Sequence, residues 1–506
     1  MGRTNGSQEL EKPLFRRRLS RARFLRLIGA GLPLIAASRG RASSAQTTGI
    51  LTSGEYPIGL WWPPPPEETT VERYRQIAAA GFNFVIGGNG VTNDASIPDA
   101  LDAAAANDLR FLLTDDPGRV EGLQDLIRGG TARTSAQTEG AEETPSIMQH
   151  LLEEDDPRES PRAASSSVAA SSLEEEIKLR VQYLHDRYAN YPALAGLNLF
   201  DEPHRSYFGR LRLAKDEVEQ QFAGAELPYV NIWPSYASPN ALGTKTYQRY
   251  LELYFSEVSP SVLSFDHYPL LSRNRITSDY FYNWAVIRRF SLKFDVPSWV
   301  FIQSMGFDGS GLGLAKRRTP DENEIFWQIN VSLAYGAKGI QYFTYWTPDN
   351  SPQIKFGDAL VARDGTSTPR YGYATNANDY LRVVGKVLLP LTPQSDVVHA
   401  RVRRLPRGAK KFKADGYVRA VSGSPIILSR FKDPNGGTER YLFVANRSFL
   451  KAAETRLTLS GLVSGVSEVN SETGQPGPVT LTGDPPRNLS LRIGPGRARL
   501  YRLETT

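Results

Sequence analysis

The sequence predicts an α/β protein, a (β/α)8 TIM barrel followed by a small C-terminal antiparallel β-sandwich. Three observations lead to this prediction. Short β-rich runs alternate with amphipathic helical stretches, eight such runs fall within about 300 residues, and after Pro390 the pattern changes to short strands separated by turn sequences. A chain of 506 residues is long enough for two folded units.

The eight predicted barrel strands are apolar runs at 57–61, 82–87, 109–115, 195–201, 227–233, 262–268, 298–304 and 339–346. Helical periodicity predicts helices that include 71–80, 173–188, 245–256, 280–294, 322–335 and a final one at 373–388. Eight consecutive β/α units favour a barrel over a doubly wound sheet. The barrel is therefore assigned to 46–390.

Two further segments depart from this alternation of strands and helices. Residues 117–172 hold acidic, serine and alanine clusters and predict a partly disordered insertion on the face that carries barrel active sites. Residues 391–506 predict the β-sandwich, with strands at 417–421, 426–430, 440–444, 455–459 and 489–493.

The first 45 residues predict an export signal. They carry ten Lys/Arg against two Glu, so the net charge of the remainder is about −2 and no nucleic-acid partner is expected. The apolar run 27–37 is interrupted by glycine and proline. The run is also too short for a membrane span, which needs about 20 residues. The stretch 20–26 resembles a twin-arginine signal with one arginine displaced. We expect an extracellular, periplasmic or cell-wall-associated protein.

Composition and motifs exclude several chemistries. Without cysteine the chain has no disulfide, thiolate metal site or cysteine nucleophile, and it has only five histidines. It has no Gly-x-Ser-x-Gly, His-Glu-x-x-His or Walker sequence. No metal and no cofactor are expected.

Polar residues at the carboxyl ends of the predicted strands are the candidate site, because barrel active sites lie there. The fourth strand ends in Asp201 and Glu202 before a proline, and the sixth in Asp266, His267 and Tyr268. The alternative for Asp201 is a helix N-cap, and for His267 a structural hydrogen bond. Glu202 and Asp266 are the predicted catalytic pair.

Aromatic residues follow several of the same strands. They are Trp61, Trp62, Trp233, Tyr345 and Trp346. Aromatic faces at a barrel mouth suit the apolar faces of sugar rings, although some of these residues can equally close the barrel. Together with the carboxylates they predict a carbohydrate substrate.

These strand ends resemble the clan of retaining barrel glycosidases that includes β-galactosidases and endo-glucanases, and the stretch 230–348 resembles bacterial β-galactosidase-like proteins. The resemblance implies that Glu202 is the acid/base, that His267 and Tyr268 are subsite residues, and that Trp346 lies under the cleaved sugar. Two positions depart from the clan. Asp201 replaces an asparagine that binds the sugar, and Gln303 replaces the glutamate nucleophile at the end of strand seven.

Glutamine cannot form a glycosyl ester, and Glu322 and Glu324 lie in a helix-start sequence. Three alternatives stay open. Another carboxylate supplies the second charge, with Asp266 ahead of Asp115, Asp116 and Asp201; a nucleophile lies elsewhere; or the barrel binds glycans without hydrolysing them. In each alternative Gln303 is a candidate substrate-binding residue. The sequence therefore predicts an exported glycoside hydrolase, with a non-hydrolytic glycan-binding barrel as the alternative.

Overall fold

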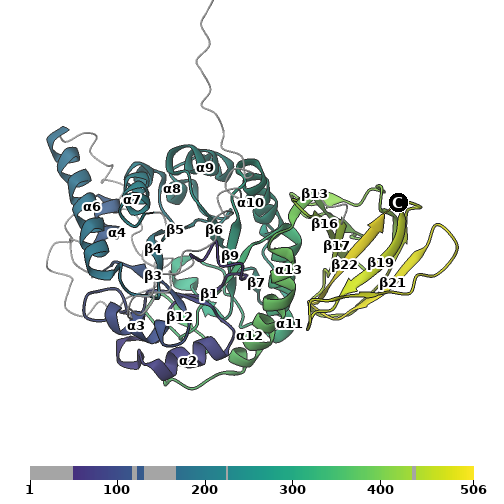
Figure 1. Ribbon diagram of the computed structural model, residues 1–506, viewed down its shortest axis with the longest axis horizontal. Helices are drawn as coiled ribbons and strands as arrows, with labels where there is room; N and C mark the ends of the chain where they lie inside the picture. Colours follow the sequence, from purple (N-terminus) through teal and green to yellow (C-terminus); the bar gives the residue numbers. More distant parts are fainter. Residues whose placement is uncertain (1–48, 117–121, 130–166, 224–225, 436–439, 506) are drawn as a thin grey trace, which may run out of the picture. The chain divides into compact units, whose positions relative to one another are not determined.

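In the computed structural model, the described residues are 49–116, 122–129, 167–223, 226–435 and 440–505. Eight parallel strands form a closed barrel in the order β1-β11-β9-β6-β5-β4-β3-β2 (Figure 1). They are β1 (Ile58–Leu60), β2 (Phe84–Ile86), β3 (Arg110–Thr114), β4 (Leu194–Asp201), β5 (Leu227–Ile232), β6 (Leu263–Asp266), β9 (Ser298–Gln303) and β11 (Gly339–Phe343). Each lies at a position that the sequence predicted, which confirms the barrel.

Helices surround the barrel (Figure 1). They are α2 (Val71–Ala79), α3 (Ile97–Ala105), α4 (Leu123–Arg128), α6 (Ser167–Tyr188), α7 (Phe208–Gln221), α8 (Pro239–Leu242), α9 (Tyr247–Leu253), α10 (Tyr280–Phe294), α11 (Glu322–Tyr335), α12 (Pro369–Tyr380) and α13 (Lys386–Leu388). The predicted helix at 245–256 continues from α9 into a π-helix (Tyr254–Val258), and another π-helix (Leu381–Gly385) joins α12 to α13. No helix in the described part of the chain is long and apolar enough to cross a membrane.

The predicted insertion at 117–172 contains α4 and the start of α6. The remainder of that stretch, and the predicted export signal, lie outside the described residues. Asp321 is the N-cap of α11, and it exchanges hydrogen bonds with Glu324. Pro320 therefore lies before the cap and outside the helix.

The C-terminal strands form two antiparallel sheets. One has the order β14-β13-β16-β17-β22-β19-β20 and the other β15-β18-β21. Their bounds are β13 (Thr392–Ala400), β14 (Lys410–Lys411), β15 (Val418–Gly423), β16 (Ile426–Lys432), β17 (Arg440–Asn446), β18 (Ala453–Leu459), β19 (Val463–Val469), β20 (Pro476–Pro478), β21 (Asn488–Ile493) and β22 (Ala498–Thr505). Buried residues of both sheets, such as Leu442 and Leu491, share one hydrophobic core, so the predicted sandwich is confirmed.

Helix α11 joins the barrel to the sandwich, and hydrogen bonds connect the two along its length. Trp327 Nε1 donates to the carbonyl of Arg447 at 3.0 Å, and Asn330 Nδ2 donates to that of Gly496 at 2.9 Å. One turn further on, Tyr335 Oη lies 3.0 Å from His399 Nε2. All twelve residues from Glu324 to Tyr335 are buried, because α11 has the barrel on one side and the sandwich on the other.

Candidate active site

Two carboxyl groups meet at the carboxyl ends of strands β4 and β6. Register pairing places Asp201 beside Asn231 of β5, and Asn231 beside Ser264 of β6. Glu202 follows Asp201 and Asp266 ends β6, so both side chains emerge at the same end of the barrel. Each residue is only 1% exposed. The structure thus brings together the two residues that the sequence predicts as the catalytic pair.

Burial and neighbouring carboxyls raise the pKa of both members of this pair. Burial raises the pKa of Glu202 well above its usual range, and the neighbouring Asp266 and Asp201 raise it further. Burial and the charge of Asp201 also raise the pKa of Asp266, to about 8. The carboxyls of Glu202 and Asp266 lie within hydrogen-bonding reach of each other, and a proton on Glu202 is what allows them to bond. The raised pKa values favour the protonated form of both carboxyls, and the proton between the two lies on Glu202.

Neither carboxylate oxygen of Glu202 accepts a hydrogen bond from an N–H or hydroxyl donor among the described residues. Its backbone is also unusual, because Glu202 has a φ of 52°. A left-handed conformation for a residue other than glycine costs about 1–3 kcal/mol and persists where the surroundings impose it. Here the amide of Glu202 donates to the carbonyl of Asn231 at 2.8 Å, and Tyr250 Oη donates to the carbonyl of Pro203 at 2.7 Å.

Asn231 is a functional candidate that the sequence analysis missed. Its Nδ2 donates to Asp201 Oδ1 at 2.9 Å and to Asp266 Oδ1 at 3.3 Å, so one amide orients two carboxylates. Ser264 Oγ lies 3.1 Å from Asn231 Oδ1 and 2.7 Å from Tyr229 Oη. This buried network fixes the amide orientation. The available signal was a lone asparagine in an otherwise apolar strand, in register with Asp201.

Tyr268 lies with the carboxyl pair, as its place in the sequence predicts. Burial raises the pKa of its hydroxyl, and Asp266 raises it further. Its ring packs against Phe343 inside the barrel, with ring centres 4.7 Å apart. Tyr236, which the sequence analysis did not single out, also interacts electrostatically with Asp266 and Glu202, and the residue as a whole is 40% exposed.

His267 has a different environment from its two neighbours. Its Nδ1 lies 3.1 Å from Asn283 Oδ1 and its Nε2 lies 2.8 Å from Thr277 Oγ1. Burial lowers the pKa of His267, which opposes a positive charge on the ring. Because both ring nitrogens already have partners, the structure gives His267 the structural hydrogen bonds that were the alternative for it.

The aromatic candidates divide into two groups. Trp61 is partly exposed, contacts the rings of Trp62 and Phe343, and packs on the cluster inside the barrel. Trp62, Trp233, Tyr345 and Trp346 are buried in the larger core. Arg73 covers the ring of Trp346 at 5.5 Å. Of the five, Trp61 is the one with an exposed face beside the barrel interior.

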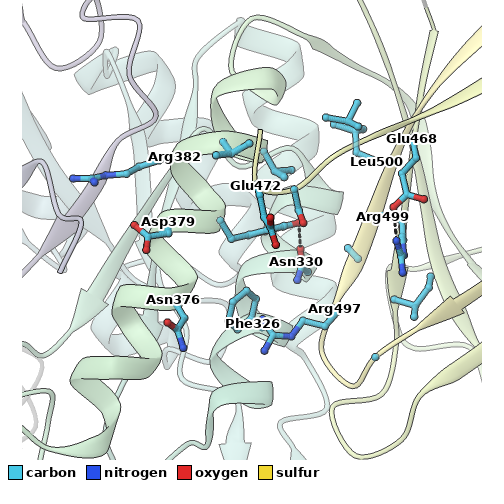
Figure 2. Close-up of a pocket in the computed structure, with 18 of the residues that line it drawn as sticks. Phe326, Asn330, Asn376, Asp379, Arg382, Glu468, Glu472, Arg497, Arg499 and Leu500 are labelled. Atoms are coloured by element: carbon cyan, nitrogen blue, oxygen red, sulfur yellow. Dashed lines mark hydrogen bonds and ion pairs between the residues drawn. The ribbon is translucent and has the colours of Figure 1, made fainter. Parts of the chain in front are cut away.

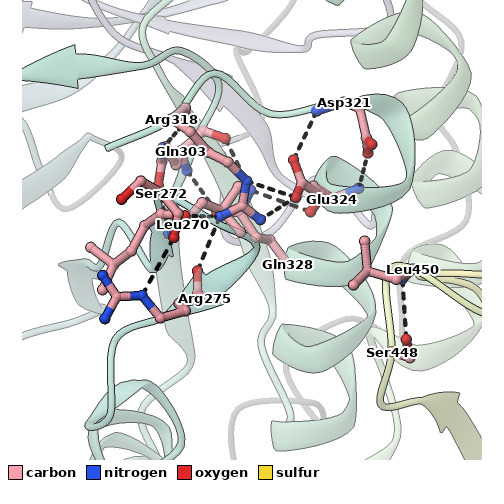
Figure 3. Close-up of polar contacts among 11 residues, drawn as sticks. Leu270, Ser272, Arg275, Gln303, Arg318, Asp321, Glu324, Gln328, Ser448 and Leu450 are labelled. Atoms are coloured by element: carbon pink, nitrogen blue, oxygen red, sulfur yellow. Dashed lines mark hydrogen bonds and ion pairs between the residues drawn. The ribbon is translucent and has the colours of Figure 1, made fainter. Parts of the chain in front are cut away.

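Gln303 ends strand β9 and is completely buried (Figure 3). Its Oε1 accepts from the amide of Leu270 at 2.9 Å, and its Nε2 donates to the carbonyl of Arg318 at 2.6 Å. Gln328 bonds the main chain of Gln303, and Arg318 pairs with Glu324. The amide of Gln303 therefore ties β9 to the short strand β7 (Leu270–Leu271) and to the loop before α11, and its oxygen and nitrogen are already used.

We expect Gln303→Glu to destabilise the chain rather than restore a nucleophile. A glutamate there sets one carboxylate oxygen against the Arg318 carbonyl and buries a charge, so at neutral pH the free energy of unfolding should fall by about 2–5 kcal/mol. A protonated glutamate can replace the amide donor, so the loss should shrink at acidic pH. Urea denaturation at pH 5 and pH 8 measures both effects. The exposed Gln182→Glu serves as control, and equal stability of the two variants at pH 8 would contradict the expectation.

The pKa of Asp266 also predicts how stability depends on pH. The folded chain keeps this proton up to about pH 8, whereas an unfolded aspartic acid loses it near pH 4. Between these values unfolding releases a proton, so the free energy of unfolding falls as pH rises, by at most about 1.4 kcal/mol per pH unit. Asp266→Asn should flatten this fall, and the exposed Asp102→Asn should leave it unchanged. Urea denaturation across this range measures the slope, and an unchanged slope in Asp266→Asn would refute the assignment.

Asp115, a further candidate for the second charge, has a structural environment. It accepts two hydrogen bonds from the guanidinium of Arg180, at 2.7 and 2.8 Å, and a third from the amide of Leu123 at 2.7 Å. The described residues contain no group of three or more His, Asp or Glu side chains placed to hold a metal ion.

No protein-family model and no curated protein sequence matches this chain. Solved structures do match. A β-galactosidase from Bacillus circulans sp. alkalophilus has 9% identity and a TM-score of 0.53, over 89% of this chain and 99% of that one. A catalytic mutant of Gan42B, a GH42 β-galactosidase from G. stearothermophilus, has 9% identity and a TM-score of 0.51. The match covers 89% of this chain and 98% of the Gan42B chain.

The match to a β-galactosidase from the psychrophilic Marinomonas ef1 has 13% identity and a TM-score of 0.46, over 68% of this chain and 63% of the Marinomonas enzyme. Identities this low establish a shared fold only. The two matches with TM-scores above 0.5 confirm the predicted resemblance to barrel glycosidases at the level of the fold, and the function is argued from the site.

Proposed function

We propose that this protein is an exported glycoside hydrolase that cleaves an O-glycosidic bond in an oligo- or polysaccharide, with Glu202 as general acid/base. One observation carries the proposal. Glu202 is a buried carboxyl at the carboxyl end of a (β/α)8 barrel, and burial together with Asp266 raises its pKa well above its usual range. An alkoxide leaving group needs a proton, and a carboxyl that stays protonated at neutral pH can donate it.

Asp266 is the second carboxyl of the proposed site. It interacts directly with Glu202, whereas the two carboxyls of a glycosidase stand about 5–5.5 Å apart in retaining enzymes and about 6.5–9.5 Å apart in inverting ones. In this arrangement Asp266 accepts a hydrogen bond from the protonated carboxyl of Glu202. For Asp266 to act on a water or on the sugar, the two carboxyls have to separate when the substrate enters between them. Asn231, which bonds Asp266 and Asp201, stands where it can hold both acids during that step.

The proposed substrate contacts come from the same end of the barrel. Asp201 borders the carboxyl pair, Tyr268 packs beside it, and Trp61 and Tyr236 offer exposed aromatic surface for a sugar ring. Once the pair has separated, the proton of Glu202 becomes available to the glycosidic oxygen, because neither of its oxygens has a donor to hold it among the described residues.

A glycan-binding barrel without hydrolysis is the second candidate, and one observation favours it. Gln303 stands at the end of strand seven, where the clan has its nucleophile, and its amide is committed to main-chain hydrogen bonds. On this alternative the protonated carboxyls serve as hydrogen-bond partners for sugar hydroxyls.

The test of the proposal is the release of reducing sugar and aryl aglycone from a panel of α- and β-linked glycosides, together with binding of the same glycans. Turnover of any substrate that is lost in Glu202→Gln supports the hydrolase. The anomeric configuration of the first product then distinguishes retention from inversion. Glycan binding by both proteins, with no turnover by either, would overturn the hydrolase in favour of the binding barrel.

A further inference from the structure

Two clefts lie between the barrel and the β-sandwich, and they differ in charge. The first has a volume of about 820 Å³ and lies between helices α11 and α12 and strands β19 and β22 (Figure 2). Two of its three lining arginines have acidic partners: Arg497 pairs with Glu322 at 3.5 Å, and Arg499 pairs with Glu468. Asp379 and Glu472 also line the first cleft, so its lining mixes acidic and basic side chains.

The second cleft has a volume of about 640 Å³ and no acidic residue in its lining. We refer to it as the cationic cleft, defined by Arg275 of the barrel, Trp327 of α11, and Arg447, Phe449 and Lys451 of the sandwich. Figure 3 shows Arg275 together with Ser448 and Leu450, which also line it. Three cations therefore face one space without a carboxylate among them.

The three cations lack partners of opposite charge. Among the described residues, no acidic group forms an ion pair with Arg275, Arg447 or Lys451. Nε of Arg447 is buried without a hydrogen-bond partner, and burial lowers the pKa of its guanidinium. Glu324, one turn before Trp327 on α11, already pairs with Arg318. A buried cation without a partner is costly, and an anionic ligand would remove that cost.

The loop that presents two of these cations is ordered by its own hydrogen bonds. Asn446 Nδ2 donates to the carbonyls of Lys451, Ile493 and Gly494 at 2.8, 3.2 and 2.9 Å. Ser448 Oγ accepts from the amides of Leu450 and Lys451, both at 3.1 Å. Binding therefore requires little ordering of this loop, which favours affinity.

We propose that the cationic cleft binds an acidic saccharide, with its carboxylate or sulfate group against Arg447 and Lys451. Guanidinium and ammonium groups form charge-assisted hydrogen bonds to such oxyanions. The edges of Trp327 and Phe449 give the cleft an apolar floor, and its volume falls within the usual range of small-ligand sites, about 300–1,000 Å³. The anion site follows from the cleft itself, whereas the choice of a saccharide rests on the proposed function.

Calorimetric titration of the full chain tests the proposal with three probes: trigalacturonate, neutral maltotriose and inorganic sulfate. Trigalacturonate should bind at least about tenfold more tightly than maltotriose, and its affinity should fall with added salt. Arg275 and Lys451 are exposed, so the double variant Arg275→Glu/Lys451→Glu should fold normally and bind at least about tenfold more weakly. Arg273 lies in the same loop as Arg275 but outside the lining of the cleft. The control variant Arg273→Glu should therefore bind trigalacturonate as tightly as the unmodified chain.

Three results would overturn the proposal. Absence of binding by both anions would remove the anion site. Equal loss in the double variant and in Arg273→Glu would place binding elsewhere. Sulfate binding as tight as trigalacturonate binding would overturn the saccharide assignment. Glu202→Gln should retain binding at the cationic cleft, so its failure is distinguishable from a failure of the proposed hydrolysis.

Discussion

Replacing Glu202 by glutamine is expected to lower kcat/KM for unactivated glycosides by about 10²–10⁴-fold, the usual contribution of a general acid. Glutamine keeps the volume of the side chain but has no proton to give to the leaving group. Aryl glycosides with good leaving groups need this proton less, so their loss should be much smaller. Steady-state kinetics on one glycoside of each kind measure the difference.

The matched control is Asp116→Asn, which changes another acid near the carboxyl ends of the strands. It should leave both rates close to those of the unmodified chain. Equal losses on good and poor leaving groups in Glu202→Gln would mean that Glu202 does not supply the proton, even if activity falls.

Asp115→Ala is expected to lower the free energy of unfolding by about 3–5 kcal/mol, because it removes one partner of a buried ion pair. Asp115 is 2% exposed and bonds both Arg180 of α6 and the amide of Leu123 at the start of α4. The substitution leaves a half-buried guanidinium and a buried amide without their acceptor. Urea denaturation measures the loss.

Glu72→Ala is the control, because it removes a surface ion pair with Arg75 in which both side chains are more than 60% exposed. Such pairs contribute about 0–1 kcal/mol. Similar losses in the two variants would show that Asp115 does not hold α4 and α6 to the end of β3.

The barrel was predictable because its signals are local. Each strand is a mostly apolar run, and buried parallel strands leave that pattern in a sequence. The position of Glu202 followed from the same logic, since the end of a strand is visible as the point where polar residues and proline begin. Asp266 followed from its equivalent place on the sixth strand.

The remaining features depend on contacts between distant residues. The roles of Gln303 and His267 are set by Leu270, Arg318, Asn283 and Thr277, which the sequence alone does not place beside them. Asn231 acquires its importance only through register with Asp201 and Ser264. Strands β13, β19 and β22 were not predicted, although the alternation in β22 was available as a signal. In β13 and β19, breaks in register near Gln394 and Gly465 interrupt the alternation of buried and exposed residues.

The central claim is that Glu202 carries a proton at neutral pH because it is buried beside Asp266. Infrared spectroscopy of the carboxyl region tests it without any substrate. We expect a protonated-carboxyl band at pH 7 that is weaker in Glu202→Gln, where the proton of Asp266 remains. In Asp266→Asn the band of Glu202 should be lost at a lower pH than in the unmodified chain. The same spectrum at pH 7 from the unmodified chain and Glu202→Gln would contradict the claim.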